Sequence, residues 1–213
     1  MRIFKKWLLL VCLSCTALPG SGQRADSFQH LSKKDGLSQV SVFAIAQDSA
    51  GFMWFGTKDG LNKYDGYQFK VYKKNASANS LVANDIRTLY VGSNNNELWI
   101  GTTTGLSKYQ PTSDNFINYL NIPSDTNSIS GNVIRQIFED SKGRLWVGTS
   151  VGLNLFDRGK NNFKRLTINN NAPQNIKAQD VKAILEDSQG QLWFGTANGL
   201  FKLIENKGNI FSF

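Results

Sequence analysis

The chain has 213 residues, a formal net charge of +8 and a mean hydropathy of −0.32. Its two cysteines, Cys12 and Cys15, both lie near the N-terminus, so the rest of the sequence has no cysteine for a disulfide, a thiol nucleophile or a metal site. No run of five or six lysine and arginine residues occurs, which argues against a basic patch that binds nucleic acid.

Residues 1–22 have the layout of a secretory signal peptide. Three cations precede an apolar run over residues 7–13, and small residues follow it. We therefore predict export and a mature chain that starts near Gln23, with a charge of +5 once the three cations are removed. An uncleaved anchor is the alternative, but the apolar run is far shorter than the roughly 20 residues that span a bilayer. Lipidation of Cys15 is disfavoured because Cys12 stands where a lipobox has leucine.

Four copies of one pattern dominate the remaining sequence. Each copy has a tryptophan followed by x-Gly-Thr and then by a Gly-Leu pair, and three of the four begin with Asp-Ser-x-Gly. The tryptophans, spaced 45, 47 and 47 residues apart, are Trp54, Trp99, Trp146 and Trp193. This period lies in the range of propeller blades and is too long for leucine-rich or ankyrin repeats.

Each copy predicts a four-stranded antiparallel meander. A short apolar run forms the first strand, and Asp-Ser-x-Gly makes the first hairpin because Asp caps the turn and Gly accepts a positive φ. In the second copy the longer segment 92–96 replaces this turn. The Trp-x-Gly-Thr segment forms the second strand, Gly-Leu opens the third, and an outer strand follows. The expected fold is all-β, a β-propeller with four four-stranded blades near residues 40–74, 84–121, 131–168 and 179–213.

Two features bear on whether the propeller is complete. Residues 28–31 resemble an outer strand in pattern and are the candidate closing strand for the last blade of a ring. The fourth copy has its own outer strand near residues 210–213, so closing a four-bladed ring would supply that strand twice. We therefore expect an N-terminal piece of a larger propeller whose missing blades belong to a parent protein. A complete four-bladed ring is the alternative.

The segment from Asp35 to Ser38 and the first repeat from Asp48 to Gly66 resemble the two-component regulator propeller of hybrid two-component sensors from Bacteroidetes-type bacteria. The resemblance covers nearly the whole mature chain. It implies a periplasmic region of two seven-bladed propellers and a β-sandwich, then a membrane helix, a histidine kinase, a receiver and a DNA-binding region. It also implies oligosaccharide detection and a second protomer in the full-length parent. The sequence to Phe213 has no kinase His-box, nucleotide-binding glycine motif or receiver aspartate, so no residue here takes a signalling role.

No catalytic residue, metal site or cofactor is indicated. His30 is the single histidine, and a catalytic role would need a nucleophile and an orienting partner. The pairs Glu139-Asp140 and Glu186-Asp187 recur at the hairpin that holds Asp48 in the first copy, which favours turn capping over acid/base chemistry. Asp-Ser-x-Gly offers too few oxygen ligands for a calcium loop. The repeated tryptophans are predicted to pack between blades, with sugar stacking as the alternative.

The candidate ligand-binding residues cluster where the first strands begin. They are Arg87, Arg135, Lys182, Asn84, Asn132 and Asp180, with Asp85 and Gln179 beside them. The three cations occupy one offset in successive repeats, and Phe43 takes that place in the first. These residues could meet at the mouth of a central channel and bind an anionic or hydroxyl-rich ligand there. The favoured interpretation is that they are solvated loop cations.

Together these features predict a periplasmic sensor propeller that binds an oligosaccharide and does not catalyse a reaction. The alternative is an exported enzyme on a propeller scaffold, such as a polysaccharide or antibiotic lyase, because the fold alone does not fix the function. A propeller for protein interaction is a third possibility. No nucleic-acid partner is expected, and membrane attachment is expected only through the parent protein.

Overall fold

The structure is a computed structural model that describes residues 27–212, apart from residues 94, 167–179 and 207–208. The predicted signal peptide and Gln179 lie outside the described residues. The chain divides into a short N-terminal unit, residues 1–30, and a second unit, residues 31–213, that holds all strands of the described residues. Residues 28–31, the candidate closing strand, are not part of a strand in this structure, so their pairing with a blade stays a prediction.

Within the described residues, sixteen strands form four antiparallel sheets, each with its four strands in chain order. A short 3₁₀ helix, Lys33–Asp35, precedes them. The strands of sheet 1 are β1 Val42–Gln47, β2 Met53–Thr57, β3 Gly60–Tyr64 and β4 Phe69–Tyr72. Those of sheet 2 are β5 Ile86–Val91, β6 Leu98–Thr102, β7 Leu106–Gln110 and β8 Asn115–Tyr119. Those of sheet 3 are β9 Ile134–Glu139, β10 Leu145–Thr149, β11 Gly152–Asp157 and β12 Asn162–Leu166. Those of sheet 4 are β13 Val181–Glu186, β14 Leu192–Thr196, β15 Gly199–Asn206 and β16 Asn209–Ser212.

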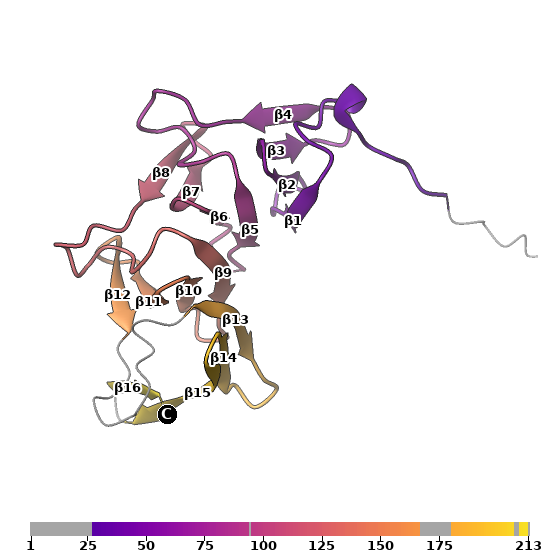
Figure 1. Cartoon of the computed structure of the whole chain (residues 1–213). Helices are drawn as coiled ribbons and strands as arrows, with labels where there is room; N and C mark the ends of the chain where they lie inside the picture. Colours follow the sequence, from indigo (N-terminus) through magenta and orange to yellow (C-terminus); the bar gives the residue numbers. More distant parts are fainter. Residues whose placement is uncertain (1–26, 94, 167–179, 207–208, 213) are drawn as a thin grey trace, which may run out of the picture. The chain divides into compact units, whose positions relative to one another are not determined.

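The four sheets follow one another as propeller blades do. The first strand of each sheet lies beside the first strand of the next, so β1 contacts β5, β5 contacts β9 and β9 contacts β13 (Figure 1). The all-β fold and the four four-stranded blades are therefore confirmed. The first strands, at whose starts the candidate ligand-binding residues lie, are therefore neighbours of one another.

The aspartate of Asp-Ser-x-Gly stabilises the first hairpin of sheets 1, 3 and 4 in the same way. One carboxylate oxygen of Asp140 accepts hydrogen bonds from the backbone N–H groups of Lys142 and Arg144, at 3.0 and 2.9 Å. The other accepts the indole N–H of Trp146 at 2.8 Å. Asp48 and Asp187 make the equivalent bonds to their own turns and tryptophans. The predicted capping role is confirmed.

Tryptophans hold neighbouring sheets together. Trp54, Trp99 and Trp146 are fully buried, each packed against aliphatic and aromatic side chains of the next sheet in the chain. Trp193 is only partly buried, because no other sheet covers its ring within the described part of the chain. Burial of three such rings at sheet interfaces supplies much of the apolar area that a domain without disulfides needs.

Glycine in Trp-x-Gly-Thr permits a close approach between sheets. A Cβ added at Gly56 would lie 2.6 Å from Cγ2 of Ile86, the first residue of β5. A Cβ at Gly101 would lie 2.7 Å from Cγ2 of Ile134, and one at Gly148 would lie 2.8 Å from the carbonyl oxygen of Val181. The glycine is therefore required by packing between sheets, as expected for a strand approached by a neighbour.

Candidate functional site

Each first strand carries a β-bulge at its second residue. In β5, Ile86 lies opposite Thr102 and Thr88 lies opposite Gly101, so Arg87 is the extra residue. The same bulge leaves one residue without a partner in each of the other first strands: Phe43 in β1, Arg135 in β9 and Lys182 in β13. All four side chains are exposed. A bulge bends the strand and redirects the extra side chain. The second residue of each first strand therefore takes the same solvent-facing position in all four sheets.

Arg135 and Asp180 form a two-pronged ion pair between sheets 3 and 4. The guanidinium Nε and Nη2 donate to the two carboxylate oxygens at 2.7 and 3.0 Å. The side chains retain 42% and 22% of their exposure, so the pair is reachable from solvent. Such a pair is planar and geometrically fixed, and its remaining N–H groups and oxygen lone pairs can bind hydroxyl groups.

Arg87 pairs within its own sheet instead. Its Nη2 donates to Oδ2 of Asp85 at 2.8 Å, and its guanidinium carbon lies 5.4 Å from the ring centroid of Phe43 in sheet 1. The ammonium of Lys58 lies 5.6 Å from the same ring. Oδ1 of Asp85 is buried without a hydrogen-bond partner among the described residues.

Asn84 and Asn132 have a scaffold role. The side-chain oxygen of Asn84 accepts the backbone N–H of Lys74, and that of Asn132 accepts the backbone N–H of Asn121, both at 2.7 Å. The two contacts are equivalent, and each fixes the start of the connection between two sheets. These asparagines lie beside the bulge cations in the sequence, but their side-chain oxygens are already occupied.

Sequence reasoning missed Gln136, the residue after the bulge in β9. Its side-chain amide bridges to sheet 4, where Nε2 donates to the carbonyl oxygen of Ile184 at 3.1 Å and Oε1 accepts the backbone N–H of Ile184 at 2.8 Å. No periodic signal could have identified it, because Ala44, Thr88 and Ala183 occupy the equivalent place in the other sheets.

Glu139 is buried in an ion pair within sheet 3. Its Oε2 lies 2.8 Å from Nη2 of Arg158, which also donates to the carbonyl oxygen of Gly143 through Nη1. The side chain of Glu139 is 1% exposed. Burial, and secondarily the charge of Glu139, raises the pKa of the nearby Tyr90 hydroxyl. Removing one partner of such a buried pair would leave an uncompensated charge, so the pair is expected to matter for stability.

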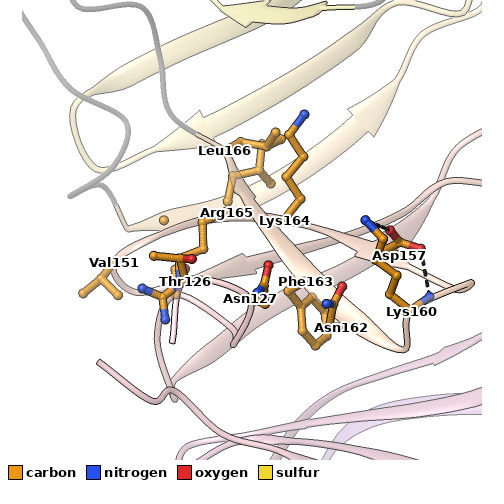
Figure 2. A pocket seen from close by; sticks show the side chains of 13 residues that line it. Thr126, Asn127, Val151, Asp157, Lys160, Asn162, Phe163, Lys164, Arg165 and Leu166 are labelled. Atoms are coloured by element: carbon orange, nitrogen blue, oxygen red, sulfur yellow. Dashed lines mark hydrogen bonds and ion pairs between the residues drawn. The ribbon is translucent and has the colours of Figure 1, made fainter. Parts of the chain in front are cut away.

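A cavity of about 730 Å³ lies at the outer edge of sheet 3 (Figure 2). The lining residues labelled there include Asn162, Phe163, Lys164 and Arg165. Arg165 is committed to the scaffold, since its guanidinium donates to the carbonyl oxygens of Ser128, Asp125 and neighbouring residues of the connection between sheets 2 and 3. The residues at the bulges do not line this cavity, so it is separate from the candidate ligand-binding residues.

The described residues also bear on catalysis and membrane insertion. Among them, no group of three or more His, Cys, Asp and Glu side chains could hold a metal ion. No helix in that part of the chain has the length and apolar character needed to cross a membrane. His30 is exposed and belongs to the short N-terminal unit.

Comparison with known families identifies the repeat. The model of the family described as two component regulator propeller matches residues 36–59, 128–151 and 175–198. Each matched segment ends just after a Trp-x-Gly-Thr strand, in sheets 1, 3 and 4. These are two-component regulator propeller repeats. The unmatched repeat of sheet 2 is the one in which segment 92–96 replaces Asp-Ser-x-Gly.

Known proteins with similar repeats are much longer than this chain. Histidine kinase P4 of Formosa agariphila is 54% identical over 48 residues, which is 22% of this chain and 4% of that protein. The extracellular domain of the hybrid two component system BT3049 of B. thetaiotaomicron superposes with a TM-score of 0.62 and 26% identity. This propeller chain covers 31% of that domain, and 85% of its own length is matched. The corresponding domain of BT4673 shares the fold, with a TM-score of 0.50, 22% identity and 27% of its length covered.

Proposed function

We propose that this propeller is part of the exported, ligand-sensing region of a hybrid two-component sensor and that it binds without catalysing a reaction. The observation that carries the proposal is the set of two-component regulator propeller repeats, supported by their superposition on an extracellular domain of a hybrid two-component system. Localisation in the periplasm follows from the same likeness together with the predicted signal peptide.

An oligosaccharide is the ligand that the exposed bulge residues suit best. The Arg135–Asp180 pair presents a planar array of donors and acceptors to solvent, and the exposed ring of Phe43 lies beside Arg87. Planar polar pairs next to an aromatic face match a hydroxyl-rich ring, which offers both donors and acceptors and an apolar C–H face. Because Arg87 and Arg135 each already bind a carboxylate, their charge is largely compensated, which favours a neutral or weakly acidic glycan.

The parent protein would supply the rest of the sensor. The chain spans less than a third of the extracellular domains of BT3049 and BT4673. We propose that further blades, a membrane helix, the kinase and a second protomer lie in the parent, and that ligand binding shifts the equilibrium between two arrangements of the protomers. This chain would then contribute recognition, and the parent would contribute phosphotransfer.

The proposal is tested by isothermal titration of a glycan panel into the mature chain, residues 23–213. We expect at least one oligosaccharide to bind, and we expect replacement of Arg87, Arg135 and Lys182 together by Ala to weaken its binding at least tenfold. Lys74→Ala is the matched control, because Lys74 is an exposed cation on the connection between sheets 1 and 2. Unchanged affinity in the triple variant would remove the site assignment, and absence of any glycan binding would contradict the function.

A further inference from the structure

Sheet 1 differs from the other sheets at the bulge of its first strand. The bulge residues of sheets 2, 3 and 4 are all cations, whereas sheet 1 has Phe43, which is 44% exposed. Sheet 1 differs again at the residue after Trp-x-Gly-Thr, where it has Lys58 and the other sheets have Thr103, Ser150 and Ala197. Sheet 1 therefore combines an exposed aromatic ring with a turn cation, and no other sheet does so.

The residue after Trp-x-Gly-Thr lies beside the start of the first strand of its own sheet. In sheet 3 the backbone N–H of Ser150 donates to the carbonyl oxygen of Val133, just before β9, at 3.0 Å. In sheet 1 the side chains show the same proximity, because the ammonium of Lys58 lies 5.6 Å from the ring centroid of Phe43. The turn residue is therefore a neighbour of the bulge residue.

A second cation reaches the ring of Phe43 from sheet 2. The guanidinium carbon of Arg87 lies 5.4 Å from the centroid of that ring. Lys58 and Arg87 are both exposed. An aromatic ring attracts cations electrostatically, so the ring holds two positive charges near each other at the junction of sheets 1 and 2. A ligand in solvent can therefore contact the ring and both cations together.

The two cations at the ring are compensated unequally. Nη2 of Arg87 donates to Oδ2 of Asp85 at 2.8 Å. The carboxylate that follows Lys58 in the chain, Asp59, pairs instead with Lys73 at 2.8 Å. Among the described residues, Asp85 thus offsets one of the two positive charges at the ring, which leaves the other for a ligand.

We propose that Phe43, Lys58 and Arg87 form a subsite for a uronic acid, the class of sugar that carries a carboxylate. The inference rests on the proposed oligosaccharide-binding function and names the sugar that this part of the molecule selects. The apolar C–H face of the sugar packs on the ring of Phe43. The sugar carboxylate accepts hydrogen bonds from the ammonium of Lys58 and from guanidinium N–H groups of Arg87. A neutral sugar gains nothing from the charge of Lys58, so this lysine determines specificity.

Isothermal titration of the mature chain with trigalacturonic acid and with its methyl ester tests the subsite. The ester keeps the sugar rings and removes the negative charges. We expect the acid to bind about tenfold more tightly than the ester, the order expected for hydrogen bonds to a charged group. Raising the salt concentration should reduce this preference, because salt screens exposed charges.

Substitutions separate the charge from the ring. Lys58→Gln should lower the preference for the acid by roughly threefold or more and leave the affinity for the ester unchanged. Phe43→Leu should weaken binding of both probes alike, because both use the ring. Lys74→Gln is the matched control and should change neither affinity, since Lys74 is an exposed cation on the connection between sheets 1 and 2. Circular dichroism and cooperative melting establish that each variant is folded.

The outcomes distinguish the subsite from the proposed function. Equal binding of acid and ester, or a preference that Lys58→Gln leaves unchanged, would overturn the subsite and leave the oligosaccharide-binding function standing. A wild-type chain that binds neither probe would also overturn the subsite. Titration of the same chain with neutral oligosaccharides then decides the proposed function separately.

Discussion

At the scale of single residues, the second repeat differs from the others at its first turn. Gly92 occupies the position of the aspartate. Its N–H donates to the carbonyl oxygen of Glu97, just as the N–H of Asp140 donates to the carbonyl oxygen of Arg144. Without the carboxylate, the indole N–H of the fully buried Trp99 has no hydrogen-bond partner among the described residues. An added side chain at Gly92 would meet Oδ1 of Asn95 at 2.4 Å, so the missing acceptor cannot be restored without rearrangement.

This difference predicts that Trp99→Phe costs less free energy of unfolding than Trp146→Phe. Both changes remove similar ring volume, but only the second breaks an indole–carboxylate bond, and the first removes an unpaired buried donor. We expect the two costs to differ by about 1–3 kcal/mol, the usual penalty of an unsatisfied buried polar group. Urea unfolding of the two variants and of wild type measures this difference in free energy of unfolding. Equal costs, or a larger loss for Trp99→Phe, would contradict the assignment.

At the scale of elements, a carboxylate at a tight turn joins sheet 1 to sheet 2. Oδ1 of Asp114 accepts the hydroxyl groups of Tyr72 and Tyr109 at 2.7 and 2.6 Å, and its Oδ2 pairs with Lys70. Burial alone would raise the pKa of Asp114, but hydrogen bonds from Lys70 and the two tyrosines outweigh it and lower the pKa to about 2. The next turn uses Asn161 in the same way, accepting the hydroxyl of Tyr119 at 2.6 Å.

The lowered pKa sets the direction of the pH dependence. A carboxyl group with a folded-state pKa below its ordinary value of 3.8 stabilises the fold above that value and loses this contribution as the pH falls toward about 2. Asp114→Asn should therefore lower stability at pH 7, by about 1 kcal/mol for a partly exposed group. Thermal unfolding from pH 7 to pH 2 should show most of this gap closing between pH 4 and pH 2. A gap that is constant over this range would rule out the charged contact.

The glycine of the second strand gives a prediction with a built-in control. Gly101→Ala places a Cβ 2.5 Å from Cγ2 of Thr88 and 2.7 Å from Cγ2 of Ile134, so we expect a loss of about 1–3 kcal/mol from overpacking. Gly195→Ala occupies the same position of the motif, but its closest neighbour is 3.3 Å away within its own sheet, so we expect a much smaller loss. Denaturant midpoints of the two variants measure the two losses of stability. Similar losses would show that contact between sheets does not require this glycine.

At the scale of the whole molecule, the repeat predicts the fold well and the site only in part. Trp54, Trp99 and Trp146 are buried as their period indicates, and Asp48, Asp140 and Asp187 cap their turns. These features are local or strictly periodic, so their role in one repeat predicts their role in the next. The common offset of the bulge residues was visible for the same reason.

The sequence could not predict the side-chain partners of the candidate site residues, because these depend on the register between sheets. Arg135 reaches Asp180, 45 positions away, whereas Arg87 binds its near neighbour Asp85 because Val133 stands where the next sheet would need an acid. The side-chain oxygens of Asn84 and Asn132 accept backbone N–H groups of the connections between sheets. Side-chain partners across an interface follow from three-dimensional packing, which the offset alone does not encode.

The central claim, that this propeller binds an oligosaccharide without cleaving it, is tested most directly by equilibrium dialysis of the mature chain against a mixed oligosaccharide pool, read by mass spectrometry. The account predicts that at least one oligosaccharide is enriched on the protein side with its mass unchanged after long incubation. Shortened products, or unsaturated products lighter by one water as a lyase would release, would contradict it.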